Sequence, residues 1–413
     1  MNAYVVGTAS TVFQKWPARG FRDLAGEVLR GALADAGVEG GAAVDAVYFA
    51  NCAMGSAGQG NIRGQVCLAP VMGLLGESTP IVNVEGGCAT GSVALHGAVQ
   101  AVRAGADLAL AIGVEKTWFP EDPARSFALF AGGIDQLHPG EWQGLFAAAG
   151  EETGLGFAPH PARVVFLDVH ALQARAHMAR YGTTAAQIAA VAARNHRHGA
   201  HNEKAQYRFQ MSVDEVLADK PVVAPLTRSM CAPISDGAAA VLVASARWLA
   251  ANPGARARAV AVRAAVLAGG RPGRRIEERS VTAVAAARAY AAAGLGPEHV
   301  EVAEVHDATA FCQVLHGEDL GFCPPGEGGA YAASAINSQD GARPMNLSGG
   351  LISKGHPLAA TGLGMVDEVV AQLRGEAGAR QAAKGPSVGL VHNAGGMVSF
   401  DEALCGVTIL ARE

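Results

Sequence analysis

Residues 82–95 read Val-Asn-Val-Glu-Gly-Gly-Cys-Ala-Thr-Gly-Ser-Val-Ala-Leu, the pattern of a strand, a turn and a helix. The apolar run 80–84 predicts the strand, Gly86 and Gly87 predict the turn, and small helix-compatible residues follow Cys88. A thiol at the N-terminal end of a helix is expected to have a lowered pKa, because free backbone N–H groups and the helix dipole favour the thiolate. Cys88 is therefore a candidate nucleophile; the alternative is a small buried cysteine in a packing turn.

The same unit occurs twice in the chain. Asn83-x-x-Gly86-Gly87 before Cys88 has a counterpart in Asn346-x-x-Gly349-Gly350, which precedes Gly355-His356-Pro357. Other matching pieces lie at nearly the same separation: the helix ends at Ala36-Gly37 and Ala293-Gly294, and the apolar runs 44–50 and 300–305. Alternating strands and helices predict parallel-rich sheets with helices on their faces.

The repeat divides the 413 residues into two halves. We expect an N-terminal half over 1–250 and a C-terminal half over 258–413, with an inserted loop domain at about 117–230. Helical patterns within the insertion cover 168–181 and 185–196, and an insertion on a rigid scaffold is typical of a lid or ligand wall. The insertion is rich in aromatic residues: Trp118, Phe119, Phe127, Phe130, Trp142 and Phe146. These side chains either line a substrate pocket or form the insertion's own core.

Composition excludes several classes of protein. The formal charge is −5 and no basic stripe occurs, so nucleic acid is not an expected partner. The basic stretch 271–279 is interrupted by two glutamates and predicts a solvated loop, with contact to a phosphorylated ligand as the alternative. The sequence contains no run of 18 apolar residues, so we expect no membrane span. The N-terminus lacks the pattern of a signal peptide. The seven cysteines are widely spaced without a Cys-x-x-Cys pair, which favours a reducing cytoplasm and no metal site.

Three polar motifs fall at strand ends or on glycine-rich turns: the Cys88 turn, residues 304–309 and residues 349–357. Strand ends collect ligands in open α/β sheets, and the repeat would bring Cys88 and His356 to one site. An imidazole that accepts the thiol proton allows the thiolate to attack a carbonyl, while His306 and the N–H groups of a turn at 392–396 would stabilise the oxyanion. The alternatives are a strand-end His306 bonded to backbone and a helix-capping His356.

Longer motifs extend over nearly the whole chain, in order. They are Cys88-Ala-Thr-Gly-Ser, Asn195-His-Arg-His, Cys231-Ala-Pro-Ile-Ser-Asp-Gly, Val305-His306-Asp307, Ser348-Gly-Gly-Leu-Ile-Ser-Lys-Gly-His356-Pro and Gln-Leu-Arg-Gly-Glu-Ala-Gly at 372–378. With these motifs the sequence resembles the thiolase superfamily. Within it, the sequence is similar to the sterol carrier protein X-type thiolases and their bacterial and archaeal relatives, which pair with a zinc-ribbon OB-fold protein.

The resemblance implies a five-layered αβαβα fold of two pseudo-symmetric halves plus a loop domain. It implies an acyl-CoA C-acyltransferase that cleaves a 3-oxoacyl-CoA with CoA, or runs the reverse Claisen condensation, in lipid or aromatic degradation. By position, Cys88 matches the acylated nucleophile, His356 its activator and His306 an oxyanion-hole residue; Gly395 and the Cys88 N–H match a second oxyanion hole. CoA is then a substrate, no cofactor is permanently bound, and the chain forms a homodimer or higher oligomer, with a small zinc-ribbon OB-fold protein as a further partner.

One departure from the family concerns the proton at the α-carbon. The cysteine that other thiolases carry near the C-terminus is replaced in the turn Asn393-Ala394-Gly395, and the cysteine that this branch carries after His-Asp is replaced by Ala308. Cys312 and Cys231 have no clear claim to the role, and a specialised substrate, or His356 or a water molecule as the proton shuttle, would account for the departure. Three alternatives therefore stay open: a ketoacyl synthase-like condensing enzyme, a retro-aldolase, and a non-catalytic thiolase-like subunit of a heteromer.

Overall fold

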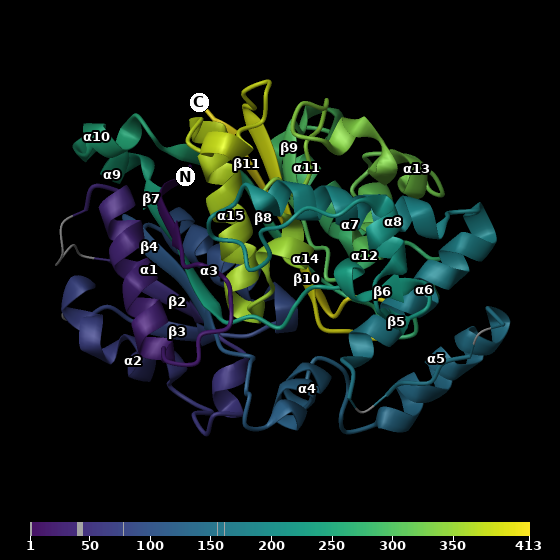
Figure 1. Ribbon diagram of the computed structural model, residues 1–413. Coiled ribbons are helices and arrows are strands. Elements are labelled where there is room, and N and C mark those ends of the chain that lie inside the picture. The colour runs from purple at the N-terminus through teal and green to yellow at the C-terminus, as the bar shows by residue number, and fades with distance from the viewer. Residues whose placement is uncertain (1, 39–43, 77, 155, 161) are drawn as a thin grey trace.

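The computed structural model describes residues 2–38, 44–76, 78–154, 156–160 and 162–413 (Figure 1). Its centre is a nine-stranded mixed sheet in the order β3-β2-β4-β7-β1-β8-β11-β10-β9. The strands are β1 (Ala3–Ser10), β2 (Ala46–Ala50), β3 (Ile81–Val84), β4 (Leu108–Glu115), β7 (Gly237–Ser245), β8 (Val260–Gly269), β9 (Val302–Val305), β10 (Val388–Gly395) and β11 (Leu404–Arg412). A separate two-stranded sheet holds β5 (Pro221–Val223) and β6 (Leu226–Thr227).

The strand order is mirrored about the junction of β1 and β8, which pair antiparallel at Tyr4 with Ala261 and at Val5 with Val260. On one side β2 runs parallel to β4, and β4 antiparallel to β7. On the other side β9 runs parallel to β10, and β10 antiparallel to β11. The predicted pair of pseudo-symmetric halves is confirmed, and the two half-sheets also join edge to edge.

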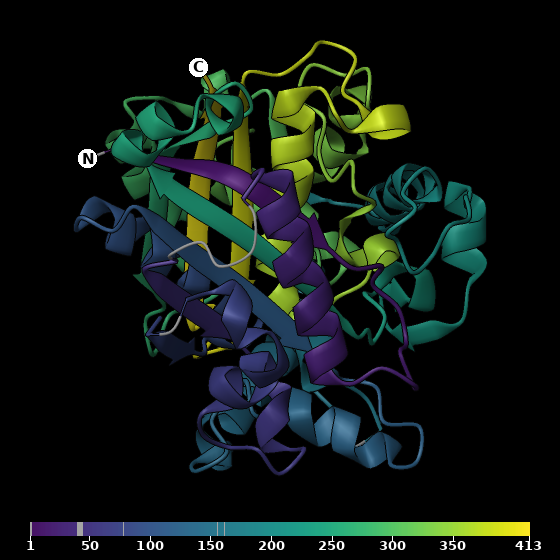
Figure 2. The same cartoon turned by 90° about the vertical axis from the view of Figure 1, so that its left-hand side faces the viewer.

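Helices form the other layers. α3 (Thr90–Arg103) and α15 (Leu358–Arg374) pack against each other between the two half-sheets. α1 (Phe21–Asp35) covers the outer face of the first half, where Figure 2 shows it in purple over the strands, and α11 (Val281–Ala293) covers that of the second. Strand β4 is buried on both faces, since Ala109 and Ala111 pack toward the central helices while its remaining apolar residues pack toward α1. This arrangement is the expected five-layered α/β fold.

The inserted segment contributes the helices α4 (Pro123–Ala131), α5 (Pro139–Glu152), α6 (Val165–Tyr181), α7 (Ala185–Ala200) and α8 (Val213–Ala218). The predicted helices 168–181 and 185–196 correspond to α6 and α7, which begin three residues earlier and end four residues later, respectively. Both helices contact α12 (Ala310–Asp319), so the insertion covers the second half although it leaves the chain from the first (Figure 1).

Some aromatic side chains of the insertion form a small core and others line a cavity, so both predicted alternatives occur. Phe146 is fully buried against Trp142, Phe157 and Phe400, with ring centroids 6.0, 5.3 and 4.9 Å away. These rings form a small core of their own. Phe130 instead lines a cavity that also reaches Cys88.

The remaining helices connect these layers. They are α2 (Arg63–Leu68), α9 (Ala246–Ala251), α10 (Pro253–Arg256), α13 (Gly328–Ala333) and α14 (Gly350–Lys354). In the part of the chain that the structure describes, no helix is both long and apolar enough to cross a membrane.

Candidate active site

Cys88 lies between the end of β3 and the start of α3, in a short 3-10 turn over Gly87–Ala89. The Thr90 hydroxyl fixes this turn, because it accepts a hydrogen bond from the Gly86 N–H at 2.8 Å and donates one to the Gly87 carbonyl at 2.6 Å. The end of β10 packs directly against the turn. A Cβ at Gly395 would lie 2.3 Å from the Cys88 backbone nitrogen, so only glycine allows this approach.

The structure brings Cys88, His306 and His356 together: one thiol or ring-nitrogen atom from each lies within 4.8 Å of the others. His306 follows β9, and His356 lies between α14 and α15. The two imidazole rings are 5.1 Å apart and nearly perpendicular. A thiol and two imidazoles at these distances are also a donor set that a metal ion can accept. The predicted meeting of the three motifs is thus observed in the structure.

Hydrogen bonds set the orientation of both imidazoles. His356 Nδ1 bonds to the Thr361 hydroxyl at 2.8 Å, while its buried Nε2 has no partner among the described residues. The Asn393 amide donates to the Cys88 carbonyl at 3.1 Å and lies 3.0 Å from His306 Nδ1. His306 Nδ1 therefore accepts a hydrogen bond, which places its proton on Nε2.

Asn393 was not selected as a site residue from the sequence, where it was recognised only as the residue that replaces a cysteine. Its side-chain oxygen lies 3.1 Å from the Ser92 hydroxyl, which fixes the direction of the amide. The amide nitrogen is left to face His306 and Cys88. Asn393 therefore holds His306 in one tautomer.

Burial decides the charges at the site. It lowers the pKa of His356 to about 3, and burial with the nearby His356 holds the pKa of His306 well below its usual value. Burial also raises the pKa of the Cys88 thiol to about 12, against the opposing effect of the Gly396 N–H. The expected lowering of this pKa by the helix end is therefore wrong, because desolvation of the thiolate outweighs the helix N–H groups. All three groups are neutral at rest.

Cys88 borders two cavities. The first contains about 740 Å³ of space and reaches His306 and His356; its apolar wall consists of Phe130, Val164, Phe166, Leu167, Ile234 and Met397. The second contains about 930 Å³ and reaches Cys88 from the side of Cys52 and Leu358. The Cys88 thiol can thus be reached from two directions.

Four further ionisable side chains line the first cavity: His170, Cys312, His316 and Glu402. Sequence reasoning did not select the histidines or Glu402, and it gave Cys312 no role. A local signal existed for one pair, because Cys312 and His316 are four residues apart on a helix and so share a face. His170 comes from the insertion, and no local pattern links it to α12.

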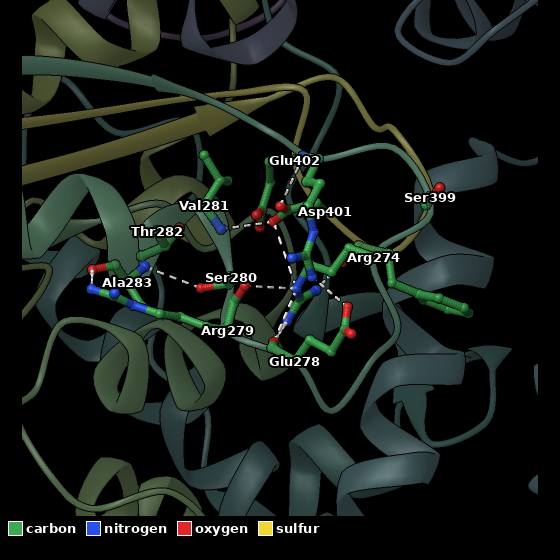
Figure 3. A network of polar contacts seen from close by, with 12 residues as sticks. Arg274, Glu278, Arg279, Ser280, Val281, Thr282, Ala283, Ser399, Asp401 and Glu402 are labelled. Carbon is green, nitrogen blue, oxygen red and sulfur yellow. Dashed lines mark hydrogen bonds and ion pairs between the residues drawn. The ribbon is translucent and has the colours of Figure 1, made fainter.

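The loop after β10, which carries Met397 and Glu402, is anchored from below by Arg274 (Figure 3). The Arg274 guanidinium is buried and donates to the carbonyls of Phe400 and Glu278, and it lies 4.0 Å from the Asp401 carboxylate. Asp401 in turn accepts the Val281 N–H at 2.8 Å at the start of α11. The expectation of a solvated loop over 271–279 is wrong at Arg274, because its donors satisfy buried carbonyls.

A repeated α/β chain with a thiol and two neutral imidazoles at one cavity defines a class of enzyme that forms covalent acyl-cysteine intermediates. The thiolase N-terminal domain family matches residues 3–247, and the thiolase C-terminal domain-like family matches residues 275–409. The chain belongs to the thiolase superfamily.

Curated relatives align over most of the chain. An acetyl-CoA acetyltransferase of Methanothermobacter thermautotrophicus is 37% identical over 95% of this chain and 96% of its own. Sterol carrier protein 2 of Oryctolagus cuniculus is 35% identical over 95% of this chain and 70% of its own. The benzoylsuccinyl-CoA thiolase subunit BbsB of Thauera aromatica is 30% identical over 83% of each chain.

Solved structures share the fold at lower identity. The Ltp2-ChsH2(DUF35) aldolase superposes with a TM-score of 0.76 at 23% identity, over 99% of this chain and 98% of that one. The Acat5 thiolase from Ascaris suum in complex with coenzyme A superposes with a TM-score of 0.67 at 17% identity, over all of both chains.

Proposed function

We propose that Cys88 is the nucleophile with which this protein acts as an acyl-CoA C-acyltransferase. The protein is a thiolase: it cleaves a 3-oxoacyl-CoA with CoA or catalyses the reverse Claisen condensation. The observation that carries the assignment of the nucleophile is the convergence of Cys88, His306 and His356 within 4.8 Å at an apolar cavity.

His356 activates the nucleophile in this proposal. Its Nε2 is buried and unpartnered among the described residues, whereas Nδ1 is held by Thr361, so Nε2 is the atom that is free to accept the Cys88 proton. Burial keeps both groups neutral until a carbonyl is present. Proton transfer then coincides with attack on the 3-oxo carbon, where the new imidazolium and the oxyanion neutralise each other.

Two sets of donors stabilise the oxyanions. His306, with its proton on Nε2, and His356 serve the thioester oxygen. The backbone N–H groups around the Cys88 turn serve the acyl oxygen, where Gly395 permits the close approach and the neighbouring Gly396 N–H lowers the pKa of the Cys88 thiol. Fixed donors in a dry cavity need no reorganisation during the reaction, which is the basis of their effect on rate.

CoA is the substrate that this assignment requires, and the Ascaris suum thiolase that shares the fold holds coenzyme A. We further propose a zinc-ribbon OB-fold partner, because the Ltp2 aldolase that shares the fold is a complex with a DUF35 protein. A homodimer through the exposed edge strand β3, where Val82 is 44% exposed, is proposed as well. Native mass spectrometry of the purified chain tests the homodimer, and a monomer at micromolar concentration contradicts it.

The physiological setting is likewise a proposal. All seven cysteines are unpaired, which fits a reducing cytoplasm. The names of the relatives fit degradation of lipid or aromatic acyl groups. The domain limits 1–250 and 258–413, with the loop domain at about 117–230, remain predictions.

The test of the function is acylation. The purified protein is mixed with acetyl-CoA and with acetoacetyl-CoA, and the acyl adduct is located by peptide mass spectrometry. We expect one acetyl group on Cys88 and CoA-dependent cleavage of acetoacetyl-CoA. A non-catalytic subunit and a retro-aldolase would show neither, and a retro-aldolase would instead release an aldehyde or ketone from a 3-hydroxyacyl-CoA supplied in a parallel assay.

A further inference from the structure

Carbon–carbon cleavage leaves a second chemical need that Cys88, His306 and His356 do not meet. When the C2–C3 bond of a 3-oxoacyl-CoA breaks, the electron pair stays on C2, and C2 must receive a proton; in condensation a proton must leave C2. Ala308, which lines the cavity, and Asn393 occupy the two places where the sequence lacks a cysteine, and neither a methyl group nor a carboxamide can act as the acid or base. Another group in the cavity has to do so.

We propose that Cys312 is this group and that His316 is the partner that holds or releases its proton. This proposal rests on the thiolase reaction proposed above. It adds to that reaction a second catalytic thiol, placed one helical turn beyond Ala308 on α12.

The first argument is placement. Cys312 is 4% exposed and lines the same cavity as Cys88, His306 and His356. Its Sγ lies 3.2 Å from the hydroxyl of Thr309, the residue that caps α12, and this contact fixes the thiol near the start of the helix. Helix N-termini favour the thiolate form of a cysteine.

The second argument is the surroundings of the thiol. His316 follows Cys312 by one turn; its Nε2 lies 3.6 Å from Glu402 and its Nδ1 lies 3.8 Å from Asp319. His170 from α6 lines the same cavity, and its buried Nδ1 has no hydrogen-bond partner among the described residues. Two imidazoles thus flank Cys312, and carboxylates behind them favour their protonation.

Electrostatics separates Cys312 from the other thiols. Burial opposes its ionisation, but His170 and His316 outweigh burial and hold the pKa of Cys312 well below the usual thiol value. Burial also opposes the charge on His316, yet Asp319 and Cys312 raise its pKa to about 10. Cys231 lacks such neighbours, and burial raises its pKa to about 12.

The proton balance closes for both half-reactions. In cleavage, the Cys88 proton moves to His356, the Cys88–C3 bond forms, the C2–C3 bond breaks, and C2 takes the proton shared by Cys312 and His316. Acetyl-CoA leaves. The thiol of the incoming CoA then returns a proton to Cys312 and its sulfur attacks the acyl group on Cys88, while His356 gives its proton back to Cys88. Condensation runs the same transfers in reverse.

The discriminating experiment measures hydrogen exchange at C2 without breaking a carbon–carbon bond. Acetyl-CoA is incubated in D₂O with each variant, and deuterium in its methyl group is followed by mass spectrometry. We expect Cys312→Ala and Cys312→Ser to slow exchange and thiolysis by about 100- to 10000-fold, the usual worth of a general acid–base group. Serine keeps the contact with Thr309 but does not ionise near neutral pH, so a structural role would be rescued by it.

Cys231→Ala is the matched control, because it removes the same atom from a neighbouring buried cysteine that does not line the cavity. It should exchange like the unmodified protein. His316→Gln tests the partner: the pH at which exchange reaches half its maximum should move upward, since the thiolate loses its cation. Wild-type exchange rates in folded Cys312→Ala and Cys312→Ser would overturn the proposal.

Labelling of Cys88 by acetyl-CoA separates this proposal from the assignment on which it rests. If the unmodified protein neither acylates at Cys88 nor cleaves acetoacetyl-CoA, the thiolase assignment itself fails. If it does both, and Cys312→Ala does both equally fast, only the role of Cys312 fails. Acylation at Cys88 with loss of cleavage in Cys312→Ala and Cys312→Ser supports it.

Discussion

The two halves of the protein share a strand order but differ in what they bring to the site. The first half presents Cys88 directly after its glycine pair, at the start of α3. In the second half the residue directly after the glycine pair is Leu351, which lies in α14, and His356 follows it only at the start of α15. His306, Asn393 and Cys312 also come from the second half. The repeat thus brings two helix ends together, and in the proposed reaction one of them carries the nucleophile and the other its base.

The sharpest test of this division is removal of the thiol from the first half. Cys88→Ala should abolish acylation and thiolysis, because Cys88 is the cysteine whose sulfur lies within 4.8 Å of both His306 and His356. Quenched-flow acylation followed by mass spectrometry measures the loss. Cys323→Ala, at a partly exposed cysteine outside the cavities described here, is the control and should react normally. Substantial thiolysis by a folded Cys88→Ala variant would show that the first half does not supply the nucleophile.

Removal of the base from the second half should have the next largest effect. His356→Ala should slow single-turnover acylation by about 100- to 10000-fold, since the Cys88 proton then has no acceptor. Because burial lowers the pKa of His356 to about 3, acylation in the unmodified protein should not decline as the pH falls from about 8 to about 6. A steep fall in the acylation rate as the pH drops through the usual histidine pKa would contradict the lowered pKa of His356.

His306 tests the oxyanion donors of the same half. His306→Ala should cost about 100- to 1000-fold in thiolysis, the effect of losing one oxyanion-hole donor. Asn393→Leu leaves the ring but frees its tautomer, so a smaller loss is expected. Steady-state rates for both variants decide the order, and an Asn393→Leu variant slower than His306→Ala would contradict the assignment of the donor to Nε2.

The smallest effect on chemistry is expected at Arg274, which anchors the loop behind the cavity. Arg274→Met leaves the Asp401 carboxylate buried without its cation, so the free energy of unfolding should fall by about 3 to 5 kcal/mol. Urea denaturation measures it. Arg275→Met is the control, because the Arg275 side chain is 70% exposed and its ion pair with Glu277 lies at the surface. An equal fall in the free energy of unfolding of the two variants would mean that the buried contacts of Arg274 stabilise the protein no more than the surface ion pair of Arg275 does.

Much of the fold was readable from local patterns. The apolar runs 44–50 and 300–305 correspond to β2 and β9, and the glycine pairs before Cys88 and His356 marked the repeat correctly. The meeting of Cys88 with His356 followed from that repeat. The edge-to-edge junction of β1 with β8 was not predicted, because two paired residues on each strand leave no pattern in sequence.

The electrostatic predictions were less successful, for a physical reason. A helix end is visible in sequence, whereas the desolvation of Cys88 depends on the packing of β10 against its turn. The burial of Arg274 likewise depends on a carbonyl more than a hundred residues away, at Phe400. The surroundings of Cys312 combine α6 with α12, and only the four-residue spacing to His316 could have been noticed beforehand.

The pairing of β1 with β7 has a consequence for how the chain acquires its structure. β1 (Ala3–Ser10) fills the gap between β7 (Gly237–Ser245) and β8, so the first half-sheet cannot close until β7 has been synthesised. Contacts this distant in sequence slow folding, and they leave strand edges uncovered meanwhile. During translation, β1 and one edge of β4 must therefore wait unpaired as apolar segments, which exposes the growing chain to aggregation until β7 emerges.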